Sequence, residues 1–245
     1  MSKWQLWLTT ALAVFVSTAF ASLPPHELAS LHAQLAFEYS KAEQYPMALE
    51  SAERAVAIDK NYVPAWLARA YVQSVLAHDE AAERDYRHAL QLAPGNAEAN
   101  NNFGQFLCAR GRAEEAMGLL GKALADPMYV SPQTAYFNLG QCSRKLNRVA
   151  EAKDYLLAAL RSAPDYVPAL KELVALYLGQ GSVKLATYYY DRLIQHAVTL
   201  GPDDLLMGIQ VARLSGDRVR EARYTAMLHS RYPDSRETQQ LLSGT

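Results

Sequence analysis

Small residues recur along this 245-residue chain with a period of 34 positions, and this periodicity constrains the fold more than any other feature. A two-residue insertion near residues 130–132 lengthens one period to 36. A period of this length indicates a stack of similar units, each packed against its neighbours, and not one globular core. The recurring positions include Trp66, Ala82, Ala89 and Pro94, then Gly104, Gly111 and Ala116, then Gly140, Asn147 and Ala152, then Gly181 and Ala186.

Each unit resembles a tetratricopeptide repeat, in which a tight turn joins two antiparallel helices. Gly104 and Gly140 lack a side chain where one helix must approach its partner closely. Gly111, Asn147 and Gly181 fall where the first helix ends, at a position that favours a positive φ. We therefore predict an all-α fold, namely a right-handed superhelical solenoid of about six helix-turn-helix repeats.

The repeat frame assigns residues 22–245 to one tetratricopeptide domain. A degenerate sixth repeat is indicated by Gly216 and Ala222, and a short capping helix is expected after it. The expected repeats span residues 29–62, 63–96, 97–130, 133–166, 167–200 and 203–236.

The first 23 residues differ in composition from the repeats. They carry one early cation, Lys3, then an uncharged apolar run that ends in Ala19-Phe20-Ala21. This pattern is typical of a secretory signal peptide, so we expect cleavage after Ala21 and export to a bacterial periplasm. The alternative is an uncleaved membrane anchor, although a run of about 20 residues that contains Gln5 and several hydroxyl side chains is a poor spanning segment.

Composition and motifs argue against catalysis and against nucleic-acid binding. The chain has 24 Lys and Arg against 25 Asp and Glu, so no basic excess favours a polyanion. Its six histidines show no metal-ligand spacing, and no nucleophile, zincin or phosphate-loop motif is present. We therefore predict a protein that is not an enzyme and that takes no cofactor, metal or small-molecule substrate.

The first helix of each repeat lines the concave face of such a stack, where a partner segment binds. The repeat frame places Phe37, Leu67, Tyr71 and Val75 on this face, and we predict that these four residues contact a partner. The alternative is that the segment next to the leader, or a neighbouring repeat, covers the rings of Phe37 and Tyr71. A carboxylate clamp is disfavoured, because its first repeat needs Lys and Asn where this chain has Ala33 and Phe37. Repeats three and four offer polar residues instead, among them Asn101 and Gln141.

The two cysteines, Cys108 and Cys142, lie near the ends of successive first helices. Successive first helices are neighbours in a repeat stack, so a disulfide is geometrically plausible if the two Cα atoms approach within about 7 Å. The alternative is two buried free thiols. Export favours the disulfide, which would join two repeats covalently.

Three segments carry a more specific resemblance: NNFGQFLCARGRAEEAM at 101–117, KALADPMYVSPQTAYFNLGQC at 122–142, and LLMGIQVARLSGDRVREARYTAMLHSRYPDS at 205–235. The ALADP-x-Y insertion and the ending around Arg231-Tyr232-Pro233 are more specific than generic repeat positions. The chain resembles the type IV pilus biogenesis and stability family of tetratricopeptide proteins (PilF/PilW), and the resemblance covers nearly all of the expected mature chain.

The resemblance implies a pilotin-like role, in which a non-catalytic scaffold assists the localisation or multimer assembly of the outer-membrane secretin or binds another pilus-apparatus protein. Family members commonly carry a lipid on a cysteine after the signal peptide, whereas no cysteine precedes Cys108 here. We therefore expect a periplasmic protein that its partner holds at the outer membrane, or alternatively one that a retained leader anchors. The competing function is a general periplasmic scaffold for another envelope or cell-division complex.

Overall fold

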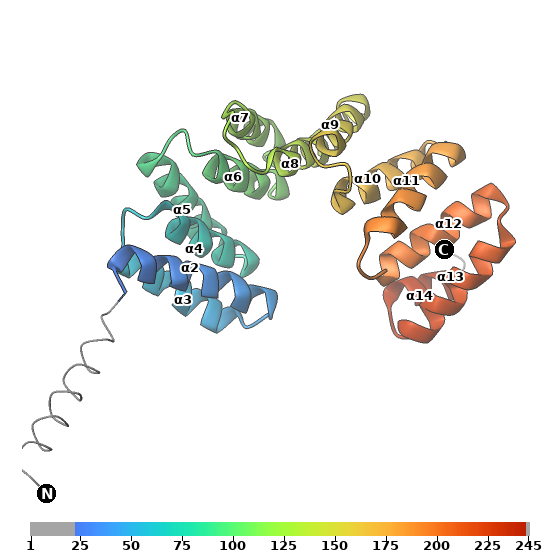
Figure 1. Cartoon of the computed structure of the whole chain (residues 1–245), viewed down its shortest axis with the longest axis horizontal. Helices are drawn as coiled ribbons and strands as arrows, with labels where there is room; N and C mark the ends of the chain where they lie inside the picture. Colours follow the sequence, from blue (N-terminus) through green and yellow to red (C-terminus); the bar gives the residue numbers. More distant parts are fainter. Residues whose placement is uncertain (1–22, 244–245) are drawn as a thin grey trace, which may run out of the picture. The chain divides into compact units, whose positions relative to one another are not determined.

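The computed structural model describes residues 23–243, so the predicted signal peptide lies outside the described residues. Thirteen helices and no strand occur within residues 23–243 (Figure 1). The prediction of an all-α tetratricopeptide fold is confirmed. The chain divides into two compact units, one ending at Pro94 and the other beginning at Gly95.

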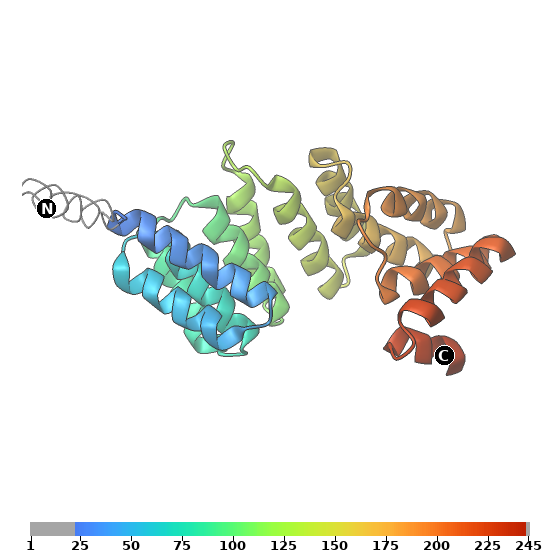
Figure 2. The same ribbon diagram turned by 60° about the horizontal axis from the view of Figure 1, so that its bottom comes forward.

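The first unit consists of two helical hairpins. The helices are α2 (Pro25–Lys41), α3 (Tyr45–Ile58), α4 (Val63–Val75) and α5 (Asp79–Leu92). α2 packs against α3 and also against α4, and α4 packs against α5 (Figure 2). Its core is rich in alanine, because helices this close together leave room for little more than a methyl group.

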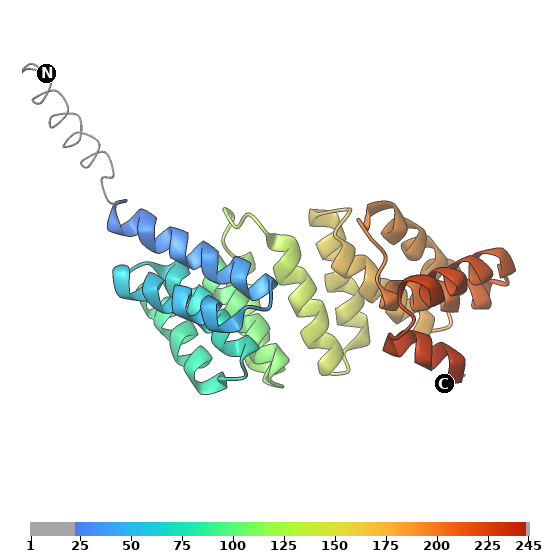
Figure 3. The same ribbon diagram turned by 90° about the horizontal axis from the view of Figure 1, so that it is seen from below.

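The second unit consists of four hairpins and a terminal helix. Each helix packs against its hairpin partner, as Figure 3 shows for α8 and α9, and α14 packs against α12 and α13. The helices are α6 (Ala97–Ala109), α7 (Ala113–Leu124), α8 (Pro132–Lys145), α9 (Val149–Ser162), α10 (Val167–Gly179), α11 (Val183–His196), α12 (Pro202–Ser215), α13 (Arg218–Arg231) and α14 (Arg236–Ser243).

Local sequence explains where the hairpins begin and turn. Five of the six first helices have proline in their first two positions, where its missing N–H costs no helical hydrogen bond. The remaining first helix, α6, is capped instead by Asn96, the residue before it, whose side chain accepts a hydrogen bond from the Ala99 N–H. Every hairpin turn contains one residue with positive φ, in chain order Glu43, Ala77, Gly111, Asn147, Gly181 and Gly216. The predicted positive φ of Gly111, Asn147 and Gly181 is thus confirmed.

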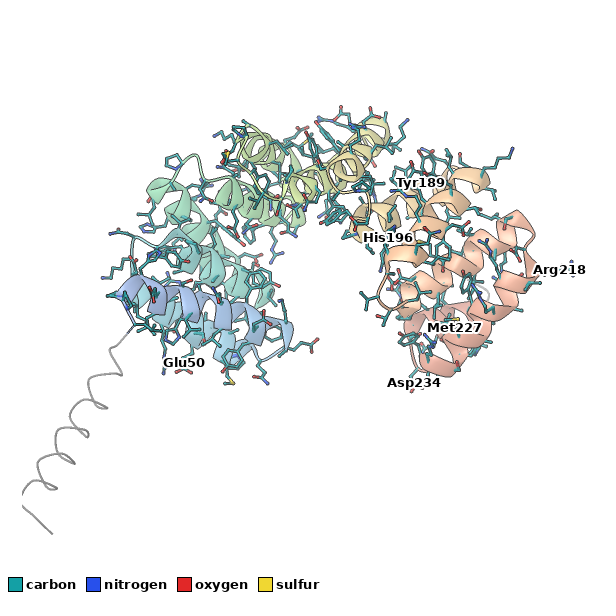
Figure 4. All side chains as sticks on the ribbon, viewed as in Figure 1. Glu50, Tyr189, His196, Arg218, Met227 and Asp234 are labelled. Atoms are coloured by element: carbon teal, nitrogen blue, oxygen red, sulfur yellow. A yellow bond between two sulfur atoms is a disulfide. The ribbon has the colours of Figure 1, made fainter. Side chains whose placement is uncertain are left out.

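Glycines allow the closest helix contacts in the second unit. A Cβ on Gly104 would lie 2.8 Å from the Leu120 side chain, and one on Gly140 would lie 3.0 Å from Leu156. Larger rings fill the space further along the chain, where Tyr189 of α11, labelled in Figure 4, stacks on a second ring, Tyr177 of α10. The predicted close approach at the two glycines is therefore present.

Gly208 is the most tightly enclosed glycine that the structure describes, and we predict that Gly208→Ala destabilises the protein. A Cβ there would lie 2.2 Å from Tyr190 Oη and 2.9 Å from the Tyr224 ring. Both rings are buried, and Tyr190 Oη donates a hydrogen bond to the Asp204 carbonyl, so neither ring can move freely. Overpacking of about 1–3 kcal/mol should exceed the roughly 1 kcal/mol that alanine gains in helix propensity.

Gly118→Ala in α7 is the matched control for Gly208→Ala. Gly118 is exposed, and a Cβ there would have no neighbour within 4 Å. Only the propensity gain of about 0.5–1 kcal/mol should remain, so this variant should be more stable than the wild type in urea unfolding. Equal gains for both variants would contradict the packing at Gly208.

Candidate functional site

An apolar surface lies on the first helices of the first unit. Phe37 of α2 and Val75 of α4 are 44% and 42% exposed, and Tyr71 of α4 is partly exposed. The rings of Phe37 and Tyr71 stack with centroids 4.8 Å apart and planes 14° apart, which fixes their orientation. We call Phe37, Tyr71 and Val75 the aromatic patch; their contact with a partner remains a prediction.

The expectation that Leu67 is exposed on this face is wrong. Leu67 is only 5% exposed, so its side chain belongs to the core and offers almost no surface to a partner. The physical reason is that α4 contacts α2, α3 and α5. A helix that packs against three neighbours has few solvent-exposed positions left. The neighbouring segments do not cover Phe37, so the alternative of a fully covered ring pair does not hold within the described residues.

Charged groups flank the aromatic patch. Lys41 Nζ lies 5.9 Å from the Phe37 ring centroid and 2.8 Å from the Glu38 carboxylate. Deeper in the unit, Arg69 donates two hydrogen bonds to Asp85 at 2.7 and 2.8 Å, which joins α4 to α5. The bond with Asp85 raises the pKa of Arg69, and the pair holds the helix that carries Tyr71 and Val75.

A disulfide joins the third and fourth hairpins. Cys108 of α6 and Cys142 of α8 are bonded, with their Cα atoms 5.6 Å apart. Both residues are buried, and Lys145 Nζ donates a hydrogen bond of 2.8 Å to the Cys108 carbonyl. The predicted bridge is present, and the alternative of two free thiols does not describe this structure.

The first helices of the second unit face each other with polar groups that are already paired. Asn138 Nδ2 donates a hydrogen bond of 3.0 Å to Asn101 Oδ1, and Asn101 is only 6% exposed. Arg144 pairs with Glu172, and Lys171 pairs with Asp203 and Asp204. These cross-helix pairs were not predicted, since residue type alone does not show which polar groups neutralise one another.

Neither a metal centre nor a membrane span emerges from the described residues. Between residues 23 and 243, no three His, Cys, Asp or Glu side chains gather into a group that could hold a metal ion. In the same part of the chain, no helix is both long and apolar enough to cross a bilayer.

Comparison with known proteins defines the family. A tetratricopeptide repeat model matches residues 133–166. The type IV pilus assembly protein PilF of Pseudomonas aeruginosa is 30% identical over 214 residues, which cover 87% of this chain and 84% of PilF. The chain belongs to the PilF/PilW family of type IV pilus biogenesis proteins.

Solved structures of this family match the chain over nearly its whole length. The crystal structure of PilW, a widely conserved type IV pilus biogenesis factor, is 37% identical with a TM-score of 0.76, and the match covers 87% of this chain and 98% of PilW. A structure of Pseudomonas aeruginosa PilF is 29% identical with a TM-score of 0.75, and the match covers 90% of this chain and 99% of PilF. The PilF/PilW resemblance noted from the sequence is confirmed.

Proposed function

We propose that this chain is a non-catalytic, pilotin-like scaffold of type IV pilus biogenesis. It acts in the periplasm, held at the outer membrane by its partner, and it assists the localisation or multimer assembly of the secretin. The observation that carries the proposal is the PilF/PilW match, which extends over 87% of the chain.

The aromatic patch provides the binding surface in this proposal. Phe37 and Val75 leave apolar area in contact with water, and a partner side chain that covers them removes that area. Burying one large apolar side chain contributes about 1.5–3 kcal/mol, enough to make the patch the centre of an interface. The Phe37–Tyr71 stack is already ordered before binding, so little side-chain entropy is lost.

The double variant Phe37→Ser/Tyr71→Ser should bind the purified periplasmic region of the secretin at least about tenfold more weakly than the wild type. The reason is that serine removes both rings while their backbone stays helical. Calorimetry or surface plasmon resonance measures the affinity, and circular dichroism checks that helix content is unchanged.

Met47→Ser is the matched control for this experiment. Met47 lies on α3 in the same unit and is 45% exposed, so it loses similar apolar area outside the aromatic patch. Wild-type affinity is expected for this control. Wild-type affinity for the double variant as well would overturn the assignment of the aromatic patch.

A further inference from the structure

A pocket of about 410 Å³ lies within the second unit, where the two-residue insertion passes the start of α6. We call it the loop pocket. Its walls are the first two turns of α6 and the segment 126–134, which comprises most of the connection between α7 and α8 and the first turn of α8. The aromatic patch contributes nothing to it, because that patch lies on α2 and α4.

A series of amide hydrogen bonds sets the polarity of one wall. Asn138 Nδ2 donates to Asn101 Oδ1, and Asn101 Nδ2 donates to Asn102 Oδ1 at 3.1 Å. Because Asn102 accepts through its oxygen, its Nδ2 ends the series as a donor in the pocket wall. A peptide carbonyl oxygen is the complementary group for such a donor.

The insertion itself forms the opposite wall, and it is held by its own hydrogen bonds. Tyr129 Oη lies 2.9 Å from Thr134 Oγ1, which donates to the Ser131 carbonyl at 2.6 Å. Because the Thr134 hydroxyl donates its only proton to Ser131, it must accept the hydrogen bond from Tyr129, so the Tyr129 hydroxyl is the donor. The Asp126 carboxylate accepts from the Met128 N–H at 2.9 Å. Hydrogen bonds internal to the segment thus hold this wall in place.

The charged side chains that line the pocket are all acidic, and two exposed apolar side chains form its lip. Glu98 and Asp126 line it, and none of its lining residues in the described chain is Lys, Arg or His. At the lip, Met128 and Val130 are 81% and 90% exposed. A ligand that fits has a cationic side chain next to an aliphatic one, on a backbone that offers a carbonyl oxygen.

We propose that the loop pocket binds an extended protein segment in which a lysine or arginine follows an aliphatic residue. The cation lies between Glu98 and Asp126, the aliphatic side chain covers Met128 and Val130, and Asn102 Nδ2 donates to a backbone carbonyl of the segment. This is a second interaction surface, which needs neither the aromatic patch nor its partner.

The probe for the test is the capped tetrapeptide acetyl-Ala-Leu-Lys-Ala-amide, titrated into the ¹⁵N-labelled full chain. Saturable NMR shifts should be confined to the amides of α6 and of residues 126–134. Replacing the lysine of the peptide by uncharged norleucine, or Glu98 by lysine in the protein, should weaken binding by about fivefold or more.

Asp154→Lys is the control for the change of charge, because Asp154 is an exposed carboxylate on α9 outside the loop pocket. It should leave the affinity for the peptide unchanged. The absence of saturable shifts, equal binding of the norleucine peptide, or shifts centred elsewhere would each overturn the proposal. Circular dichroism of both variants separates loss of binding from loss of fold.

Discussion

Arg69→Met should lower the free energy of unfolding by about 3–5 kcal/mol, because it leaves the buried Asp85 carboxylate without its partner. The Asp85 side chain is only 8% exposed, and its two oxygens receive hydrogen bonds of 2.7 and 2.8 Å from Arg69. Urea unfolding measures the loss, followed by the fluorescence of Trp66 in the first unit. Trp66 is the one tryptophan among residues 23–243, because the other two lie within residues 1–22.

Two further variants separate charge pairing from packing. Arg69→Met/Asp85→Leu removes both charges and should recover most of the stability, because an apolar pair of similar size replaces a buried ion pair at little net cost. The control is Arg54→Met, which removes the ion-pair partner of Glu50 (labelled in Figure 4). Both side chains of this pair are 61% exposed, so the free energy of unfolding should change by less than about 1 kcal/mol. A loss at Arg69 no larger than at Arg54 would contradict this account.

Cys108→Ala/Cys142→Ala should lower the free energy of unfolding by about 3–4 kcal/mol. The bond closes a loop with a sequence separation of 34 residues, so removing it gives the unfolded chain more conformations. Circular dichroism in urea measures the change. A reducing agent should destabilise the wild type by a similar amount and leave the alanine variant unaffected, whereas equal stability of wild type and variant would contradict the structural role of the bridge.

The repeat architecture was predictable because its determinants are local and recur. Gly104 and Gly140 are required by close helix packing, and both show this in the structure. Positive φ was predictable at Gly111, where residue type favours it, but not at Glu43 or Ala77. At those two positions the hairpin geometry imposes the conformation on residues that do not favour it.

The candidate site was only partly predictable, for a reason that concerns packing. The exposure of Phe37 and Val75 follows from their places in the repeat frame, yet Leu67 in the same frame is buried. Its burial depends on how α2, α3 and α5 enclose α4, and a repeat frame treats every unit as equivalent. The loop pocket likewise depends on how residues 126–134 fold back on α6, which residue type does not encode.

The most direct test of the proposed function is the amount of heat-resistant secretin multimer, and the membrane with which it fractionates, in a strain that lacks this gene. Loss of the multimers, or their accumulation in the inner membrane, is expected. The wild-type gene should restore them, whereas the Phe37→Ser/Tyr71→Ser gene should not. Normal multimers in the outer membrane of the deletion strain would contradict the pilotin-like role.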